Sequence, residues 1–273
     1  MAKRVSEALV LRTYPLREAD LIVSFFSRDQ GKLRGVAHRA RRPKSPFGAG
    51  LERLSEVRLS YYQRETRELV NLDSCDLIRS QFNLLSDYTA GVALDFIAEV
   101  CEHLLPPEEA NDKFFRLLAA VLDCFHQSRD RQGAVWRGTT YFSLWSVRLS
   151  GWLPALDVCL GCGSVLEYKD RAFFSRARTG LICDYCRRAT GGGNWELTAQ
   201  SRALAAEMLR QPVSQIPESG WSAQTAADLR RFLVQQIETH AERRLITARM
   251  LEEAEPPEEG APDAEATRRA GTF

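Results

Sequence analysis

Histidine is scarce in this chain, and the usual signatures of catalysis are missing. Four histidines occur among 273 residues, without the spacing of a metal site or a catalytic triad. They are His38, His103, His126 and His240. There is no glycine-rich loop for phosphates, no nucleophile elbow, and no carboxylate cluster of the kind a magnesium-dependent nuclease needs. The pair Glu108 and Glu109 is more typical of a helix start than of a catalytic dyad. We therefore expect that the protein is not an enzyme.

Long apolar runs are also missing. No stretch approaches the roughly 20 apolar residues that a membrane-spanning helix requires. Residues 1–4 lead into a strand-like run and not into the apolar segment of a signal peptide. We expect a cytoplasmic protein that does not bind membranes and whose cysteines stay reduced.

The formal net charge of +1 hides a strong asymmetry along the chain. Residues 1–67 contain 15 Lys and Arg against 7 Asp and Glu, whereas residues 252–273 contain 7 acids against 2 arginines. A basic N-terminal region is typical of proteins that bind polyanions, and a Pro- and Glu-rich end is typical of a disordered tail. We expect the tail to act only as a solubilising segment. The alternative is that its acids compete with a polyanion for the basic region.

The first 79 residues predict short strands separated by turns. Apolar and polar residues alternate or form short runs rich in β-formers, without helical periodicity. The predicted strands are Val5–Thr13, Leu21–Phe26, Lys32–His38, Val57–Tyr62 and Leu69–Ile78. Such a series in about 75 residues favours a five-stranded β-barrel of the OB-fold type.

After Gln81 the spacing of apolar residues becomes helical. The predicted helices cover residues 81–105, 110–125, 134–149, 198–209 and 223–253, and the glycines at 191–193 predict a hinge before the last two. The chain is therefore expected to be an α+β multi-domain protein, with the barrel followed by an α-helical domain.

Four of the seven cysteines form two pairs with two residues between the members of each pair. They are Cys159, Cys162, Cys183 and Cys186. This spacing is typical of a tetrahedral zinc site, and four filled positions favour a structural over a catalytic ion. Disulfides, a dithiol redox centre and buried thiols are the alternatives. The single cysteines Cys75, Cys101 and Cys124 are best explained as small core residues.

The segment between the two pairs is long enough for a hairpin that closes the predicted zinc module. Gly161 and Gly163 suit knuckle turns that need positive φ. Arg187 and Arg188 follow the second pair and are expected to offset the negative charge of four thiolates on one zinc.

Cationic residues gather on the third predicted strand and in the loop after it. The predicted nucleic-acid contacts are Lys32, Arg34, His38, Arg39, Arg41, Arg42, Lys44 and Tyr62. Phe47 and Tyr61 are further aromatics close by in sequence. A cationic groove with stacking aromatics is a common way to hold single-stranded nucleic acid. The alternatives are a solvated loop with core tyrosines, and a protein-interaction module whose basic loop binds an acidic partner.

Several sequence motifs occur in the order found in one protein family. They are Glu7–Leu11, Arg17–Asp20, Gly31–Leu33, Arg41–Ser45, the Tyr61–Tyr62 strand and the two cysteine pairs. Their succession resembles the bacterial RecO family of DNA repair and recombination mediators over residues 1 to about 251.

The resemblance implies a division into an OB-fold, helices, an embedded zinc module and C-terminal helices. The expected boundaries are 1–79 for a basic DNA-binding OB-fold, 80–154 for a helical domain, 155–192 for the zinc module, 193–253 for helices packing on the helical domain, and 254–273 for a disordered acidic tail.

The resemblance further implies binding of single- and double-stranded DNA and strand annealing, in a cytoplasmic protein associated with the nucleoid. The expected partners are RecR and the single-strand-binding protein. With RecR, the protein is expected to help load RecA onto DNA coated by the single-strand-binding protein, and a role for RecF is left open.

Overall fold

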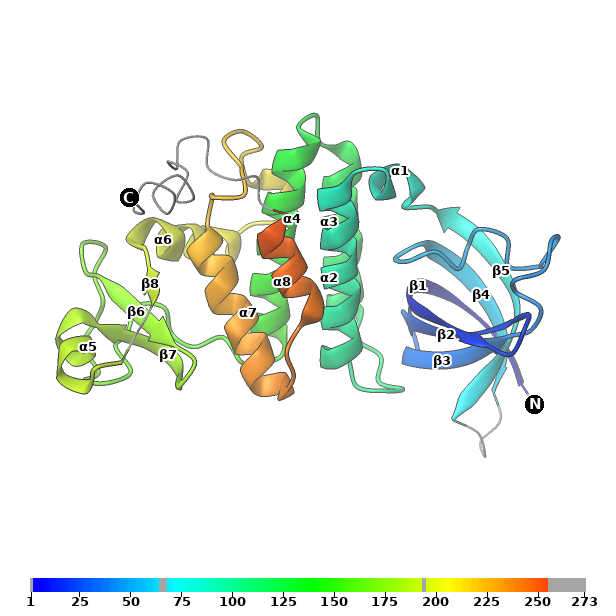
Figure 1. Ribbon diagram of the computed structural model, residues 1–273, viewed down its shortest axis with the longest axis horizontal. Coiled ribbons are helices and arrows are strands. Elements are labelled where there is room, and N and C mark those ends of the chain that lie inside the picture. The colour runs from blue at the N-terminus through cyan, green and yellow to red at the C-terminus, as the bar shows by residue number, and fades with distance from the viewer. Residues whose placement is uncertain (1, 64–67, 193–194, 255–273) are drawn as a thin grey trace, which may run out of the picture.

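The computed structural model describes residues 2–63, 68–192 and 195–254. Figure 1 shows an elongated molecule with a β-barrel at one end, a layer of helices in the middle and a small β-module at the other end. Within the described residues, no helix is both long and apolar enough to cross a membrane.

The barrel consists of β1 (Ala2–Leu16), β2 (Asp20–Ser27), β3 (Gly31–Ala37), β4 (Glu56–Gln63) and β5 (Leu69–Arg79). It is closed, with the strand order β1-β2-β3-β5-β4, in which β3 and β5 are parallel. All five strands were predicted, from alternation or from short runs of β-formers, and the OB-fold is confirmed.

The length of β1 lets one strand close the barrel. Its first half pairs with β4 and its second half with β2, and the register shifts between Val10 and Arg12. Such an irregularity bends a strand and increases its local twist. The barrel core is apolar and includes Phe25 and Tyr61, whose rings meet edge to face at 5.8 Å.

The helical domain begins with α1 (Phe82–Leu85) and α2 (Tyr88–Leu104), followed by α3 (Asp112–Gln127) and α4 (Arg131–Leu149). Asp87, Asn111 and Asp130 cap α2, α3 and α4, and each side chain accepts a hydrogen bond from a backbone N–H in the first turn. The single helix predicted for 81–105 is therefore wrong, because the cap at Asp87 starts a separate helix.

Two C-terminal helices pack on this domain, α7 (Ala227–Ala241) on α4 and α8 (Ile246–Glu253) on α2. The single helix predicted for 223–253 is wrong. Ala226 (φ 58°) and Glu242 (φ 53°) adopt left-handed conformations that interrupt it. A new helix starts after Leu245, since the Glu99 carboxylate accepts hydrogen bonds from the N–H groups of Ile246 and Thr247.

The barrel is fixed to the helices through an apolar face and a turn. Phe26 on the outside of β2 meets the rings of Phe114 and Phe115 in α3 at 6.3 and 5.8 Å. Gly31 (φ 74°) lies so close to Glu109 that an added Cβ would be 2.1 Å from its carbonyl oxygen. Glu108 and Glu109 precede the start of α3 and contact the barrel.

The small β-module contains β6 (Ala172–Ser175), β7 (Arg178–Cys183) and the short helix α5 (Asp184–Thr190). The predicted hairpin between the cysteine pairs is the β6–β7 hairpin. A third strand, β8 (Trp195–Leu197), pairs with β6, so the sheet continues past residue 192.

The chain then continues through α6 (Ala199–Met208) and the 3-10 helix η1 (Val213–Gln215). Thr198 caps α6 as the sequence predicts. The last predicted segment, the acidic tail, lies outside the described residues after Ala254, as does Gly193 of the predicted hinge.

Candidate nucleic-acid surface and metal centre

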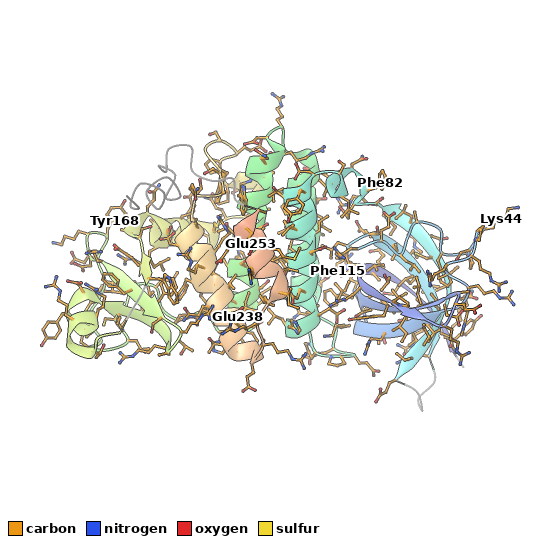
Figure 2. All side chains as sticks on the ribbon, viewed as in Figure 1. Lys44, Phe82, Phe115, Tyr168, Glu238 and Glu253 are labelled. Carbon is orange, nitrogen blue, oxygen red and sulfur yellow. The ribbon has the colours of Figure 1, made fainter. Side chains whose placement is uncertain are left out.

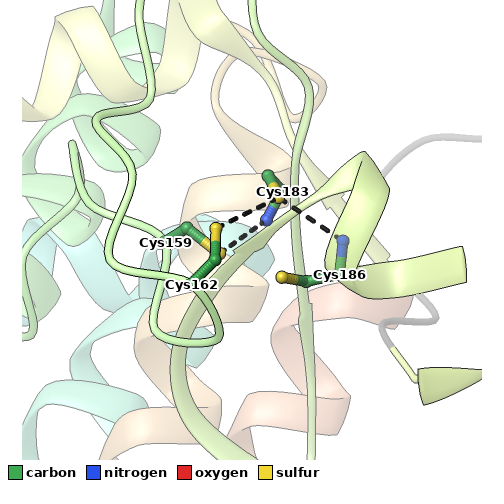
Figure 3. A group of neighbouring side chains, drawn as sticks. All are labelled: Cys159, Cys162, Cys183 and Cys186. Atoms are coloured by element: carbon green, nitrogen blue, oxygen red, sulfur yellow. Dashed lines mark hydrogen bonds between the residues drawn. The ribbon is translucent and has the colours of Figure 1, made fainter. Parts of the chain in front are cut away.

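The four paired cysteines converge on one point from two loops of the module. Their Sγ atoms all lie within 4.8 Å of one another. Figure 3 shows Cys159 and Cys162 on the first loop facing Cys183 and Cys186 at the start of α5. Four sulfurs at such separations can hold one metal ion, because each can reach a common centre.

Backbone N–H groups point at the sulfurs and stabilise their negative form. Cys159 Sγ accepts from the N–H groups of Gly161 (3.4 Å) and Cys183 (3.2 Å), and Cys183 Sγ accepts from Cys186 N–H (3.4 Å). Burial alone would raise the pKa of Cys159, but these donors lower it. Hydrogen bonds from Ser164 lower the pKa of Cys162 to about 6. This donor set fits a thiolate-bound cation.

Two glycines serve the loop around Cys159 in different ways. Gly163 has the predicted positive φ of 73°, whereas Gly161 has no positive φ. A Cβ on Gly161 would instead lie 2.9 Å from Cys186 Sγ, so its missing side chain makes room for the second pair.

The arginines after the second pair share one acidic partner. Arg187 and Arg188 form ion pairs with Asp184 at 2.9 and 2.5 Å, and Arg187 also lies over the Phe173 ring. Asp184 offsets one of the two positive charges, and compensation of the thiolates by the other stays a prediction.

The three single cysteines are buried, which confirms the prediction that they are core residues. Burial raises the pKa of Cys75 to about 12 and raises the pKa of Cys101 and Cys124 as well. These thiols stay protonated and lie apart from the metal-binding group.

The basic loop, residues 38–44, follows β3 at the end of the barrel farthest from the helices, where Lys44 is labelled in Figure 2. Its first residues are held by Asp20, which binds His38 Nδ1 (3.0 Å) and the Arg39 N–H (2.8 Å). The Arg39 hydrogen bond and then the His38 contact lower the pKa of Asp20. The backbone of the loop is thereby fixed while its side chains stay exposed.

Four members of the basic loop, here called the loop cations, are exposed. They are Arg39, Arg41, Arg42 and Lys44. No loop cation forms an ion pair with a residue in the described part of the chain. Arg39 and Lys44 have positive φ, which is uncommon for side chains of this size.

Arg34 belongs to a second cationic group on the outer face of the barrel. Its guanidinium lies over the Tyr14 ring at 5.5 Å, and that of Arg12 lies over the same ring at 5.2 Å. The register brings them together, since Ser24 pairs with Arg12 on one side and with Arg34 on the other. We did not predict Arg12 and Tyr14 as contact residues, although they lie two residues apart on one strand.

Other predicted contact residues lie elsewhere. Lys32 Nζ donates to the Glu102 carbonyl oxygen at 2.5 Å at the junction with the helices, and burial lowers the pKa of Lys32. Tyr62 lies under Lys3 on β4 and is separated from β3 by β5. Phe47 and Tyr61 are buried in the barrel core. The structure therefore does not bring these residues to the loop cations.

Comparison with known proteins matches nearly the whole chain to one family. The family model "Recombination protein O N terminal" matches residues 1–81, and "Recombination protein O C terminal" matches residues 85–248. The chain belongs to the RecO family. The two RecO models meet between β5 and α2, where the barrel gives way to the helices.

Curated RecO relatives align over most of their own length. A protein named DNA repair protein RecO from Koribacter versatilis is 47% identical over 247 residues, which cover 90% of this chain and 97% of the relative. The RecO protein of Bifidobacterium longum subsp. infantis is 30% identical over 86% of this chain and 91% of its own. That of Anaeromyxobacter sp. strain Fw109-5 is 27% identical over 91% and 95%. Membership of this family supports a role in DNA repair.

Proposed function

We propose that this RecO-family chain is a non-enzymatic recombination mediator that binds single- and double-stranded DNA and promotes annealing. With RecR, it helps to load RecA onto DNA coated by the single-strand-binding protein. The observation that carries the proposal is the set of exposed loop cations without acid partners, on the OB-fold of a chain related to DNA repair proteins.

The chemistry of this surface suits a phosphate backbone. Guanidinium and ammonium groups release counterions when they neutralise phosphates, and this binding does not depend on base sequence. Tyr14 lies on β1, with the guanidiniums of Arg12 and Arg34 over its ring. A base can stack on such a group by aromatic and cation contacts, at about 1 to 3 kcal/mol for each stacked base.

The DNA surface in this proposal consists of the loop cations together with Arg12, Tyr14 and Arg34. His38 supports it through Asp20. Lys32 holds the barrel on the helices, and its place at the junction gives it a structural role instead.

Zinc is the metal that fits the cysteine group best. Four thiolates without a histidine or a carboxylate favour a zinc ion with a structural role, one in each chain. Cys159, Cys162, Cys183 and Cys186 would hold it, and the ion would fix the two loops that carry them.

A salt titration tests DNA binding against its rival, an acidic protein partner of the basic loop. For a single strand, the logarithm of the binding constant should fall linearly with the logarithm of salt concentration. The slope is about −0.7 for each phosphate contacted. A measurable, steep slope supports the proposal, and absence of DNA binding at low salt contradicts it.

The partner proposals need a separate experiment. Purified protein immobilised on beads should retain RecR and the single-strand-binding protein when each is added alone. A variant with the four loop cations changed to alanine should retain RecR equally well if the basic loop serves DNA. Failure to retain either protein would remove the mediator role while leaving DNA binding intact.

A further inference from the structure

The turn between β1 and β2 carries an acid that contacts the start of the basic loop. Asp20 is the first residue of β2, and its side chain is only 14% exposed. One carboxylate oxygen lies 3.0 Å from His38 Nδ1, and the other accepts the Arg39 N–H at 2.8 Å. Both oxygens of this acid are therefore used inside the chain.

The backbone of the same turn contacts the next part of the loop. The Ala19 carbonyl accepts the Arg41 N–H at 3.0 Å, and the Glu18 carbonyl accepts from the Arg41 guanidinium at 3.4 Å. Every residue type offers a backbone carbonyl, so these contacts do not depend on the side chains at positions 18 and 19. The Asp20 contacts do depend on its carboxylate, and a substitution can remove them.

The hydrogen bond from Arg39 to Asp20 lies at the point where the chain leaves β3. Arg39 has a φ of 55°, a left-handed conformation that few residues with a side chain adopt. Such a conformation persists where the surrounding contacts select it. The Arg39 carbonyl then accepts the Arg42 N–H at 3.0 Å and begins the next turn. Asp20 thus fixes the residue that sets the course of the loop.

The far end of the loop is held in a different way. Phe47 is buried in the barrel core, and it needs no charged partner to stay there. The loop cations lie between this apolar anchor and the polar contacts of Asp20. Loss of the Asp20 carboxylate should therefore release the near end of the loop and leave the barrel core complete.

The charge of Asp20 is unfavourable for the proposed ligand. The hydrogen bond from Arg39 and the contact with His38 lower the pKa of Asp20, so its carboxylate is ionised at neutral pH. A negative charge beside the loop cations repels phosphates and reduces the positive potential of the surface. By charge alone, removing this acid should strengthen DNA binding. A role in positioning predicts the opposite.

We propose that Asp20 is a positioning residue for DNA binding, which orders the basic loop before a strand arrives. A loop that is already ordered loses less conformational entropy on binding, so its cations bind phosphates more tightly. Asp20 acts through Arg39 and His38 and does not itself contact DNA. The inference rests on the proposed binding of DNA by the loop cations.

Two substitutions remove the same charge and differ in their hydrogen bonds. Asp20→Ala loses both contacts. Asp20→Asn keeps an oxygen that can accept the Arg39 N–H, and its amide can donate to an unprotonated His38 Nδ1. Asp76→Ala is the matched control, because it removes an exposed acid of β5 and shows what the loss of one charge does by itself.

Two quantities are measured on the full chain. The first is the affinity for oligothymidylate of about 16 nucleotides, the upper end of the site size of one OB-fold. The second is amide hydrogen exchange in residues 38–45. Parental exchange in β4 and β5 shows that the barrel of each variant is folded.

Asp20→Ala should speed exchange in the loop and weaken binding about tenfold, the entropy cost of ordering one backbone residue. Asp20→Asn should restore parental exchange, and its affinity should equal or exceed that of the parent, as should the affinity of Asp76→Ala. Undiminished affinity of Asp20→Ala contradicts the inference. A loss of affinity with parental exchange in the loop, or an equal loss in Asp20→Ala and Asp20→Asn, also contradicts it.

A variant with all four loop cations changed to alanine separates this inference from the proposed function. If that variant binds DNA more weakly than the parent while Asp20→Ala does not, the positioning role alone fails. If it binds DNA as tightly as the parent, the proposed surface fails and the positioning role fails with it.

Discussion

The barrel and the β-module use their candidate functional residues in opposite ways. The loop cations are exposed and form no ion pairs in the described part of the chain, while the barrel core beneath them is complete without them. The four cysteines of the module converge on one point, and backbone amides of both loops point at their sulfurs. The candidate site of the barrel therefore consists of surface side chains outside its core. The candidate site of the module consists of residues that join its two loops.

This difference determines what a substitution can reveal. Removing charge from the basic loop should change binding and leave stability almost untouched, because exposed cations without ion-pair partners contribute little to folding. Removing a sulfur should change stability first, because the two loops that carry the cysteines meet at the metal site.

The largest expected effect comes from Cys159→Ser or Cys186→Ser. Loss of one ligand should release the zinc, which stabilises small zinc domains by an apparent ~10 to 16 kcal/mol near neutral pH, and the module should unfold locally. Elemental analysis and proteolysis of residues 155–192 check it. Cys75→Ser is the control, because it removes a buried thiol outside the cluster and should keep its zinc. Parent protein with much less than one zinc per chain would contradict the prediction.

A smaller effect is expected where the module joins the helices. The buried Arg202 of α6 donates to the carbonyl oxygens of Leu166 (2.9 Å), Glu167 (2.9 Å) and Asp170 (2.7 Å). Arg202→Leu leaves these acceptors without their donor and should cost about 3 kcal/mol of unfolding free energy. Denaturant unfolding measures it. Arg210→Leu, on an exposed residue just after α6, should change the free energy of unfolding little. Equal losses of stability in both variants would show that the hydrogen bonds of Arg202 have no special role.

Lys32→Met tests, within the barrel itself, whether a cation binds DNA or holds the fold. The affinity for a single strand should stay at the parental value, because Lys32 donates to a backbone carbonyl at the junction. Burial lowers the pKa of Lys32, so the parent gains stability as pH rises through that lowered pKa towards the ordinary value. The variant should lack this gain. Paired unfolding curves between neutral and alkaline pH check it, and a loss of DNA affinity would return Lys32 to the binding surface.

The smallest effect is expected from deleting residues 255–273. The segment has five acids and two arginines, but charges separated by more than about 8 Å are largely screened at physiological salt. We expect equal DNA affinity with and without it at low and at physiological salt. A gain in affinity on deletion that appears only at low salt would show that the acids compete with DNA for the basic loop.

Patterns in the sequence were sufficient for the barrel and the cysteine group because both are local signals. Alternation and short runs of β-formers located all five strands, and the paired spacing identified four sulfurs that the fold brings within 4.8 Å. The break between α7 and α8 had no such signal. No glycine or proline marks it, and the caps come from Glu238 and from the distant Glu99.

The binding surface was only partly predictable for a similar reason. The loop cations form a run that is visible in the sequence, but the contact of Arg12 and Arg34 with Tyr14 depends on strand register. Lys32 and Arg34 are two residues apart on one strand face. Only the position of the helices decides that the first is buried against Glu102 while the second stays exposed.

The central claim is that the loop cations bind DNA without holding the fold. The most direct test is the salt dependence of single-strand affinity for a variant with Arg39, Arg41, Arg42 and Lys44 all changed to alanine. Its matched control changes the exposed Arg129, Arg131, Arg148 and Arg210 to alanine.

Removing the loop cations should lower the salt slope by up to about 2.8, at about 0.7 for each lost phosphate contact, with an unchanged melting temperature. A slope and affinity equal to those of the control would contradict the account and place the DNA site elsewhere.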